Sequence, residues 1–502
     1  MSHSAMPTAS ESRRRRRRRP GSSLITTIAL TGILALLVLA SLSFARSSTQ
    51  QTAREGRADI AIQVADAGVN RYISRLVEDP RYYEHWIDLA EDPRIDPYGA
   101  VHAPGTAWTP GVSWTYAGPP QTWIDLQSGS RFGKAAYSLR ISPPPAGTDL
   151  VTVLSTGRAD RTSPKPVTRS IQSQIRPTSI ADFQMISNAT VKYGTTATTT
   201  GKLYSAADIN HQGVAKAPAY AAHWTCSNNA FACPNATSPA AVFTKGVYNA
   251  VTTPSFADKF PSPIDFAQFT KTRLDIKDAA TAQGTAFNSA SASAWMVQFL
   301  ADGRVRVWRI TGTSDPGATV ATGGYQCPVT YTIPGGNQPF YMYFEQPVIV
   351  SDGSTKADNC APTPGVGPRP STVNGRVTIA TKSNVYVGGN IAYAQPGDDV
   401  LGLIAGGEVV ITAYTPRNLS WRAASLAQSG QWRTYYNTNV GDAHDSMLYV
   451  GSQTTFSGGY ASMFDNREYQ WDETLARLRP PLYPILEGSW ETFYWREVLP
   501  PG

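Results

Sequence analysis

Acidic residues in the carboxyl-terminal part of the chain are the side chains whose type and spacing come nearest to a metal site. Asp398 is followed directly by Asp399, and Asp442 lies three residues before Asp445. Calcium requires several oxygen ligands that converge on one point, and neither pair has the spacing of a calcium-binding loop. Aspartates in such positions more often shape turns by accepting hydrogen bonds from nearby backbone amides. The sequence therefore predicts no metal ion and no cofactor.

Residue patterns that enzymes require at fixed spacing are absent from the sequence. There is no G-x-x-x-x-G-K-[ST] loop for phosphates, no G-x-S-x-G elbow and no H-E-x-x-H helix, and the six histidines are scattered. A surface polysaccharide-active enzyme is an alternative that needs acids stacked on neighbouring strands. Glu408 is the lone acid among the short apolar segments of the carboxyl-terminal half. We predict no catalytic residue and a protein that is not an enzyme.

The four cysteines all follow the hydrophobic segment near the amino terminus. They are Cys226, Cys233, Cys327 and Cys360, and they contain no C-x-x-C pair. His223 is the only histidine near them, so two disulfides in an oxidising compartment fit better than a zinc site. We predict local pairing, Cys226 with Cys233 and Cys327 with Cys360. Four cysteines permit three connectivities, and unpaired thiols are the alternative.

The positive charge of the chain is concentrated at its amino terminus. The formal net charge is +7, and the run Arg13–Arg19 alone carries seven positive charges. The remainder of the chain is therefore near neutral. Because phosphate binding needs a broad cationic surface, nucleic acid is not an expected partner.

A hydrophobic segment shortly after the arginine run predicts a membrane anchor. Leu24–Phe44 contains no charged residue, and about 20 apolar residues in a helix span the hydrocarbon core of a bilayer. Positively charged flanks stay in the cytoplasm. We therefore predict a single-pass protein of the cell membrane, with residues 1–21 as a basic cytoplasmic leader and the carboxyl-terminal body outside. A cleaved secretory signal is the alternative, although its apolar core is usually shorter.

Helical sequence continues beyond the hydrophobic segment. No proline occurs from Arg46 to Val77, and Asp79-Pro80 then supplies a stop because the residue before proline disfavours the helical region. Apolar residues recur at three- and four-residue steps, which predicts one buried stripe. The stripe consists of Ile62, Ala65, Val69, Ile73 and Leu76. One continuous helix from about Ser22 to Val77 is expected.

The amino terminus resembles that of a known family. The segment GSSLITTIALTGILALLVLA, followed by QVADAGV from Gln63 to Val69, is similar to the start of the PilX-like minor pilins of type IV pilus assembly. The resemblance implies that a prepilin peptidase cuts after Gly21 and leaves Ser22 first, and that the helix packs against other pilin-like subunits. The fifth residue after Gly21 is Thr26, where major pilins carry a glutamate that neutralises a neighbour's amino terminus. An accessory, initiating or tip subunit is therefore expected rather than a repeated fibre subunit.

Three segments after the helix have β character. Their apolar residues alternate with polar ones, and Pro/Gly turns separate them, which indicates an antiparallel meander. The segments are Ala136–Ile141, Leu150–Thr156 and Val167–Ile175. We expect this sheet to lean on the protruding helix and to cover its stripe, in a pilin-like β-rich domain at residues 80–178.

The remainder of the chain predicts short stacked strands. From residue 179 onward, short apolar runs are set among Gly, Thr, Ser and Asn. Coils that bury their apolar faces on their neighbours are typical of a β-solenoid. The clearest runs are Val377–Ile379, Val385–Val387, Leu401–Leu403, Val409–Ile411 and Met447–Tyr449. No fixed repeat length is visible, so an irregular β-sandwich is the alternative.

The carboxyl-terminal region resembles a second family. The segments VNGRVTIA from Val373, DDVLGLIA from Asp398, RPPLYP from Arg479 and YWRE from Tyr494 are similar to the DUF4900 family of bacterial envelope proteins. That family has no known function, so the resemblance implies location and architecture and supplies no catalytic residue. Residues 366–502 are assigned to this solenoid region, and 179–365 to a β-rich region with disulfide-bearing insertions.

Together these features predict a mainly β protein with one long amino-terminal α-helix, a β-meander and an irregular β-solenoid-like body. The helix is divided into a transmembrane part at 22–45 and an extramembrane part at 46–79. The expected function is that of a non-catalytic minor-pilin-like accessory protein in type IV pilus assembly, tip structure or surface attachment. An uncleaved membrane-anchored adhesin or envelope scaffold is the alternative. Expected partners are the membrane and other pilin-like subunits. A surface glycan or a protein is the further ligand that exposed aromatic residues near Tyr435 would contact.

Overall fold

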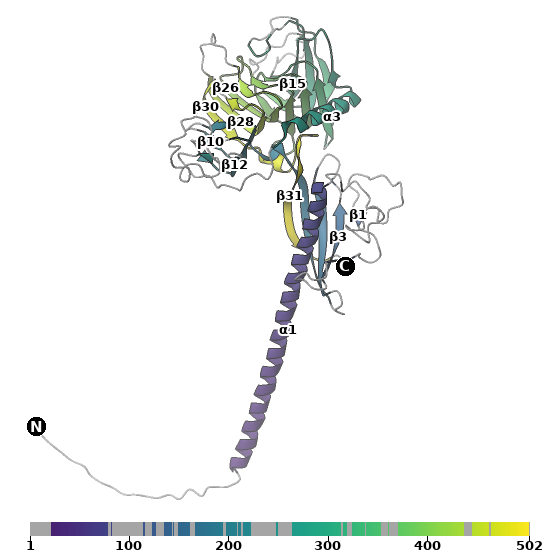
Figure 1. The fold of residues 1–502 in the computed structure, drawn as a ribbon, viewed down its shortest axis with the longest axis vertical. Helices are drawn as coiled ribbons and strands as arrows, with labels where there is room; N and C mark the ends of the chain where they lie inside the picture. Colours follow the sequence, from purple (N-terminus) through teal and green to yellow (C-terminus); the bar gives the residue numbers. More distant parts are fainter. Residues whose placement is uncertain are drawn as a thin grey trace, which may run out of the picture.

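The computed structural model has a long helix with a β-rich body at its upper end (Figure 1). It describes residues 22–78, 82, 114–115, 123–126, 135–142, 144, 149–160, 166–193, 197–207, 209–211, 214–221, 247–248, 264–312, 315–318, 324–336, 338–352, 360, 370–435, 444–460 and 463–500. The main prediction of the fold class is confirmed, because one long amino-terminal helix precedes a chain that is mostly strand.

The long helix is α1, Ser22–Glu78. It is continuous across the predicted border between its transmembrane and extramembrane parts, and it ends one residue later than the sequence indicated. Its end coincides with the Asp79-Pro80 pair of the sequence, as expected from the effect of proline on the residue before it. Figure 1 shows that only the upper part of α1 runs beside strands.

A six-stranded antiparallel sheet, called the neck sheet below, lies against the upper part of α1. Its main path is β1-β3-β4-β5-β31, and β2 also pairs with β3. The strands are β1 Trp114–Thr115, β2 Ile124–Asp125, β3 Ala136–Ser142, β4 Val151–Ala159, β5 Val167–Ser179 and β31 Ile485–Val498. The predicted meander of three strands is therefore confirmed as β3, β4 and β5, which pair in sequence order.

The last strand, β31, does not lie with the region that precedes it in the sequence. It pairs antiparallel with β5, from Ile485 beside Ser179 to Val498 beside Ser170. The predicted solenoid region includes all of 366–502, whereas β31 lies in the neck sheet. Residues 180–484, called the distal body below, are consequently inserted between two neighbouring strands of the neck sheet.

The distal body is built mainly from two sheets whose strands pair parallel on successive passes of the chain. One contains β18 Pro339–Phe344, β21 Arg376–Thr381, β24 Val400–Ala405, β26 Asn418–Ala427, β28 His444–Thr455 and β30 Phe464–Gln470 in neighbouring positions. The other contains β15 Ala294–Leu300, β19 Val348–Val350, β22 Val385–Val387, β25 Val409–Ile411, β27 Trp432–Thr434 and β29 Gly459–Tyr460. All five of the short apolar runs identified in the sequence lie in these strands.

Side chains at equivalent positions of successive strands stack on one another. Val348 pairs with Val385, Val385 with Val409, and Val409 with Trp432. The intervals between these partners are 37, 24 and 23 residues, which explains why no fixed repeat is visible in the sequence. Parallel stacking of this kind is how solenoid coils bury their apolar faces, whereas a β-sandwich pairs its strands antiparallel.

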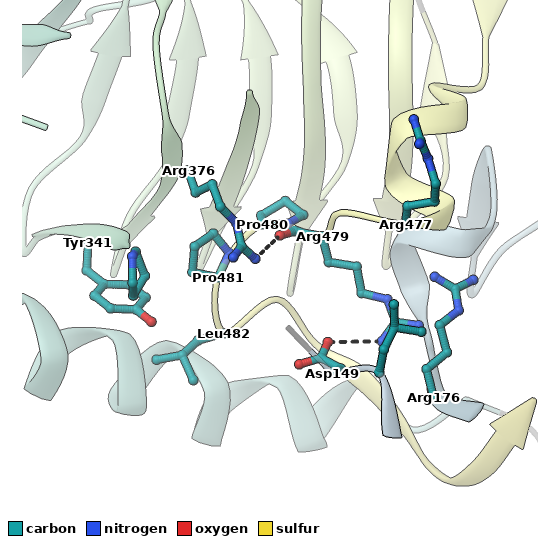
Figure 2. Close-up of a pocket in the computed structure, with 11 residues that line it drawn as sticks. Asp149, Arg176, Tyr341, Arg376, Arg477, Arg479, Pro480, Pro481 and Leu482 are labelled. Atoms are coloured by element: carbon teal, nitrogen blue, oxygen red, sulfur yellow. Dashed lines mark hydrogen bonds and ion pairs between the residues drawn. The ribbon is translucent and has the colours of Figure 1, made fainter. Parts of the chain in front are cut away.

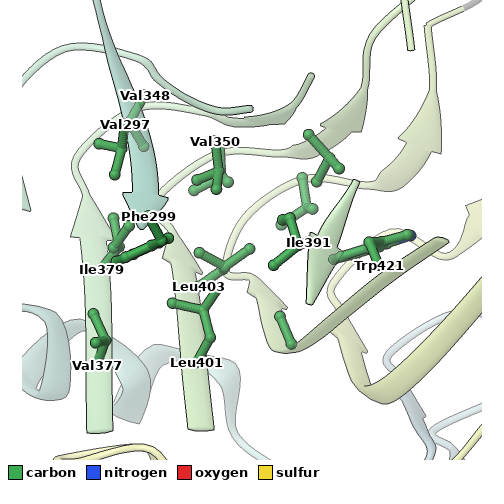
Figure 3. Close-up of a cluster of buried hydrophobic side chains, with 14 of the residues drawn as sticks. Val297, Phe299, Val348, Val350, Val377, Ile379, Ile391, Leu401, Leu403 and Trp421 are labelled. Carbon is green, nitrogen blue, oxygen red and sulfur yellow. The ribbon is translucent and has the colours of Figure 1, made fainter. Parts of the chain in front are cut away.

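The largest core lies between the two sheets of the distal body. Figure 3 shows Val377 and Ile379 of β21 beside Leu401 and Leu403 of β24. These side chains are fully buried. Trp421 belongs to the same core, with its ring 4.3 Å from that of Tyr449 and 5.9 Å from that of Trp432.

A second helix, α3 Phe269–Ala282, covers the outer face of the larger sheet. Phe269, Ile276 and Ala280 lie on one side of it and are buried against Tyr343 and Ile404. Residues 179–365 are predicted to be β-rich, so this helix is a difference from the prediction.

The remaining elements extend the two sheets or form short additions. In the parallel sheets and beside them lie β6 Met185–Ser187, β8 Thr198–Thr199, β9 Leu203–Ser205, β11 Val214–Ala215, β12 Ala219–Ala221, β14 Ala286–Phe287, β20 Ser371–Val373 and β23 Ile391–Tyr393. Antiparallel β16 Arg304–Ile310 and β17 Val329–Thr332 end the smaller sheet. A separate small sheet contains β7 Val191–Tyr193, β10 Ile209–His211 and β13 Val247–Tyr248. Short 3-10 turns are η1 Ile180–Asp182, η3 Phe266–Gln268 and η4 Glu473–Ala476.

Candidate functional site: the amino-terminal helix and the neck sheet

The lower part of α1 exposes an unusual amount of apolar surface. Within the described residues, α1 is the one helix long and apolar enough to cross a membrane. Its large side chains are more than half exposed and point in all directions around the axis. They include Ile28, Leu30, Ile33, Leu34, Leu36, Leu37, Val38, Leu39, Leu42 and Phe44. A helix that is apolar all round is stable only inside a protein or a membrane.

The hydroxyl groups in this part of α1 are satisfied inside the helix itself. Thr31 donates to the carbonyl oxygen of Thr27 at 2.9 Å, and Ser41 donates to that of Leu37 at 2.8 Å. Ser43 donates to the carbonyl oxygen of Ala40 at 2.8 Å. In a bilayer core no water is present to bond such groups, so internal hydrogen bonds reduce the cost of placing them there. The lower helix is therefore compatible with lipid despite its threonines and serines.

A polar stretch separates the apolar part of α1 from the part that packs on the neck sheet. Residues 45–57 are all exposed, and Arg46, Arg54, Glu55 and Arg57 carry charge. Thirteen helical residues span about 20 Å at 1.5 Å per residue. The neck sheet thus begins well above the apolar segment.

The upper part of α1 buries one stripe on the neck sheet. The predicted stripe is correct for Ala65, Val69 and Leu76, which are buried, whereas Ile62 and Ile73 are only half-buried. The buried stripe also includes Ala61, Val64 and Tyr72. It is therefore rotated slightly from the prediction, because the sheet contacts the side of the helix that carries the small residues.

Two glycines set how closely helix and sheet approach. A Cβ atom at Gly157 of β4 would lie 2.0 Å from the carbonyl oxygen of Ala61 and 2.5 Å from the amide nitrogen of Ala65. At Gly68 of α1, a Cβ atom would lie 2.5 Å from the Ser155 Oγ. Real Cβ atoms do not approach other atoms this closely, so any larger residue must push the helix and the sheet apart.

In the sequence Gly68 belongs to the QVADAGV motif, whereas Gly157 belongs to no predicted motif. A signal for the second glycine was present, because a glycine inside a strand pattern often marks a close backbone approach. Its neighbours on the helix, Ala61 and Ala65, were not identifiable from the sequence, since they belong to a different element.

The predicted processing residues lie at the start of α1. Ser22 is the first residue of α1, while Gly21 lies outside the described residues. Neither this position nor the role of Thr26 is tested by the geometry, so cleavage after Gly21 stays a prediction.

One of the two predicted disulfides lies in the described part of the chain. Cys327 and Cys360 are bonded, and they lie 33 positions apart in the sequence. The predicted partners Cys226 and Cys233 lie outside the described residues. The bond from Cys327 to Cys360 agrees with an oxidising environment for the distal body.

Two of the acidic residues that were considered as metal ligands, Asp399 and Asp445, have structural partners. Asp399 is buried and accepts hydrogen bonds from the backbone amides of Gly375, at 2.7 Å, and Gln395, as expected for a turn-shaping aspartate. Asp445 lies 3.0 Å from the guanidinium of Arg417. Asp442 lies outside the described residues. The residues that the structure describes contain no group of three or more His, Cys, Asp or Glu side chains that could hold a metal ion.

Two further residues named from the sequence also have defined contacts. Glu408 accepts hydrogen bonds from the guanidinium of Arg433, the shorter at 2.8 Å. The Tyr435 hydroxyl donates to the Asp315 carboxylate at 2.6 Å. Tyr435 is therefore held by its own fold, and the residues that follow it lie outside the described part of the chain.

Comparisons with known proteins do not assign this chain to a family. No family model matches the chain, and no curated protein matches it. Among solved structures, one match is the crystal structure of the competence-associated pilin ComZ from Thermus thermophilus, at 13% identity. The match covers 88% of this chain and 98% of that one, with a TM-score of 0.30. That score is too low to establish a common fold over the whole chain.

Proposed function

We propose that this protein is a minor-pilin-like accessory subunit, anchored in the membrane by α1 and carrying its distal body outside the cell. One observation carries the proposal: a single unbroken helix is apolar and exposed below, and buried on an antiparallel sheet above. This division suits a subunit whose helix passes between a bilayer and a bundle of similar helices. The resemblance of its sequence to PilX-like minor pilins supports the same function.

The exposed apolar surface requires a partner. At 1.5 Å per residue, Thr27–Phe44 is about 27 Å long, close to the roughly 30 Å of a bilayer core. The large apolar side chains of this segment would be costly to leave in water, at roughly 25 cal/mol per Å². Lipid meets this demand before assembly, and the helices of other pilin-like subunits meet it within a fibre.

The direction of insertion follows from the charges at the two ends of the apolar segment. The arginine run at 13–19 precedes the segment, and such runs stay in the cytoplasm. The distal body is then outside. The disulfide between Cys327 and Cys360 supports this orientation, because disulfides persist in oxidising compartments.

An accessory rather than a repeated position is supported by Thr26. A hydroxyl group there carries no charge and cannot neutralise a neighbour's amino terminus. We further propose that the protein is not catalytic, which is supported by the structural bonds of Asp399, Glu408 and Asp445. Incubation of the full chain with a panel of surface glycans, with and without calcium, tests this part, and product formation would contradict it.

The decisive experiment is mass spectrometry of the amino-terminal peptide from cells with and without prepilin peptidase. We expect a chain that starts at Ser22 in the first strain and an uncleaved chain in the second. Gly21→Leu should block cleavage, whereas Gly32→Leu is a matched control in the same segment, because a Cβ atom at Gly32 meets nothing within 4 Å. A start at Met1 or Ser2 in both strains would instead establish an uncleaved anchor and favour an adhesin or scaffold.

A further inference from the structure

A groove of about 310 Å³ lies on the larger sheet of the distal body. Three neighbouring strands, β26, β28 and β30, each contribute three consecutive residues to it (Figure 1). These residues are 418–420, 446–448 and 466–468. Its volume is at the lower end of the roughly 300–1,000 Å³ that small-molecule sites occupy.

The register of the three strands arranges the side chains of the groove in rows. Neighbouring strands lie about 4.8 Å apart, and every second residue along a strand lies about 6.6 Å further on. Two rows of three side chains therefore cover a patch of about 10 by 7 Å. The first row consists of Asn418, Ser446 and Asn466, and the second of Ser420, Leu448 and Glu468.

Both rows lie on the face of the sheet that points away from the largest core. Leu419 and Met447 occupy the positions between the rows, and both are 1% exposed in that core. Successive side chains of a strand point to opposite faces, so the two rows point outward. Four members of the rows are exposed, while Ser446 and Leu448 are half-buried.

The polar side chains of the rows keep hydrogen-bonding groups that no described residue occupies. The Ser446 Oγ donates to the Asn418 Oδ1 at 2.6 Å, which directs the Asn418 Nδ2 donor to the groove. The Asn466 Nδ2 donates to a backbone carbonyl oxygen at 3.3 Å, so its Oδ1 is an acceptor for a ligand. Gln470 donates to one oxygen of Glu468 at 2.7 Å, and the second carboxylate oxygen is a further acceptor.

An apolar side chain lies among these polar groups. Leu448 is the middle member of the second row, between Ser420 and Glu468. A sugar ring has the matching combination, because its C–H groups form an apolar face and its hydroxyl groups both donate and accept hydrogen bonds. Small-molecule sites commonly combine an apolar surface with a few placed polar groups.

The charges near the groove are balanced. The three strands carry two arginines and three acidic residues, and a third arginine directly precedes β26. One pair of them is joined across the strands, since Arg417 lies 3.0 Å from Asp445. This balance favours an uncharged ligand over a phosphate or an acidic polymer. The six residues are Arg417, Arg422, Arg467, Asp445, Asp465 and Glu468.

The smaller cavity at the junction of the neck sheet and the distal body, of about 150 Å³, differs from the groove. Figure 2 shows Arg376, which donates to the carbonyl oxygen of Arg479 at 3.3 Å, and Arg479 beside Asp149 at 3.2 Å. Arg176 also lines this cavity and lies 2.7 Å from Asp182. These bonds connect the two parts of the molecule, so the cavity belongs to the structural joint.

We propose that the groove on β26, β28 and β30 binds an uncharged glycan. Hydroxyl groups of the sugar bond to Asn418, Asn466 and Glu468, and the C–H face of one ring lies on Leu448. Amide and carboxylate groups suit this task because each offers more than one hydrogen-bonding site. Such binding gives the distal body a function of its own, which depends neither on cleavage after Gly21 nor on entry into a fibre.

The test uses the full chain in a polyoxyethylene detergent, whose head group contains no sugar that could compete. An array of uncharged oligosaccharides of glucose, galactose, mannose and N-acetylglucosamine identifies the best probe, and isothermal titration calorimetry measures its affinity. We expect saturable binding of at least one array member. Its counterpart with a uronic acid should bind at least tenfold more weakly, because Glu468 repels a carboxylate. No binding of any array member, or equal or tighter binding of the uronic acid form, would overturn the proposal.

Two variants locate the glycan in the groove. Asn466→Ala should weaken binding about threefold to tenfold, as expected for the loss of one or two hydrogen bonds. Glu468→Gln should weaken binding of the uncharged glycan by a similar factor and tighten binding of the uronic acid form. A general loss of folding cannot produce these opposite changes.

Matched controls come from exposed residues outside the groove. Asn188→Ala and Glu473→Gln repeat the two substitutions at exposed positions that do not line it, and both should leave the affinity unchanged. An unchanged glycan affinity in Asn466→Ala and Glu468→Gln, or an equal loss in the controls, would contradict the assignment of this groove.

Discussion

In the neck sheet, neighbouring strands pair antiparallel and α1 covers one face. In the distal body, strands from successive passes pair parallel and two sheets share a core. The first arrangement depends on small residues that let a helix approach a sheet, namely Gly68, Gly157 and Ala61. The second depends on large side chains that fill the space between the sheets. Added volume should therefore damage the neck, and lost volume should damage the distal body.

The largest effect is expected for Trp421→Ala in the distal body. Trp421 is fully buried and packs on Tyr449 and Trp432, so its truncation leaves a large cavity that costs about 3–5 kcal/mol. Urea unfolding with hydrogen exchange read by mass spectrometry should show faster exchange in β26–β28 and little change in the neck sheet. Trp495→Ala is the control, because Trp495 is 48% exposed. Equal destabilisation by both variants would contradict the expectation that the distal body depends on large buried side chains.

Gly157→Val should disrupt the neck while leaving the distal body folded. The new side chain meets the backbone of Ala61 and Ala65, which cannot rotate away, and overpacking of this kind costs about 3 kcal/mol or more. Faster hydrogen exchange is expected in β4 and in α1 above residue 60. Gly335→Val is the control, since a Cβ atom at Gly335 meets nothing within 4 Å. Unchanged exchange in α1 for Gly157→Val would show that the helix does not depend on this contact.

Within α1, the same substitution should have opposite effects at two glycines. Gly68→Ala places a Cβ atom against the Ser155 Oγ and the Tyr137 ring and should destabilise the neck by about 1–3 kcal/mol. A Cβ atom at Gly56 meets nothing within 4 Å, so Gly56→Ala should stabilise the helix by about 0.5–1 kcal/mol. Thermal unfolding followed by circular dichroism measures both. If both alanines raise the stability, the close approach at Gly68 is not required.

The smallest effect is expected for Lys277→Gln, which breaks an ion pair on the surface of the distal body. Lys277 donates to Glu345 at 2.6 Å, and this hydrogen bond holds the pKa of Glu345 below its usual value. A lowered pKa stabilises the fold at pH values above that of the unfolded carboxyl, and this contribution is lost as pH falls through the folded pKa. For a partly exposed pair the loss at pH 7 is below about 1 kcal/mol. The difference in unfolding free energy from the unmodified protein should shrink as the pH falls below about 4.3, the pKa of an unfolded glutamate, and should vanish below the lower pKa of folded Glu345. A constant difference would point to lost packing instead.

Much of the architecture was predictable because it depends on patterns that are local in the sequence. The absence of proline from Arg46 to Val77 and the Asp79-Pro80 pair fixed the length of α1 to within one residue. Alternating apolar residues identified β3, β4 and β5, and short apolar runs identified strands such as β21 and β24. In each case the information lies in one continuous stretch of the sequence, and the periodicity of helices and strands makes it readable.

Two features of the structure were not predicted, namely the helix α3 and the exact orientation of the buried stripe on α1. The amphipathic α3 was overlooked in a region that reads mostly as strand. The rotation of the buried stripe on α1 toward Ala61 and Tyr72 follows from the close contact at Gly157, a residue of another element.

The sequence by itself determined the membrane-compatible helix, the meander and the presence of short stacked strands. Only the tertiary structure decided that β31 returns to β5, and that Arg176 meets Glu491 although 315 residues separate them. Strand pairing and buried ion pairs depend on which distant segments meet, and the closure of so long a loop changes the free energy only slowly with its length. No local pattern records that choice, so the junction between the neck sheet and the distal body became visible only in the folded chain.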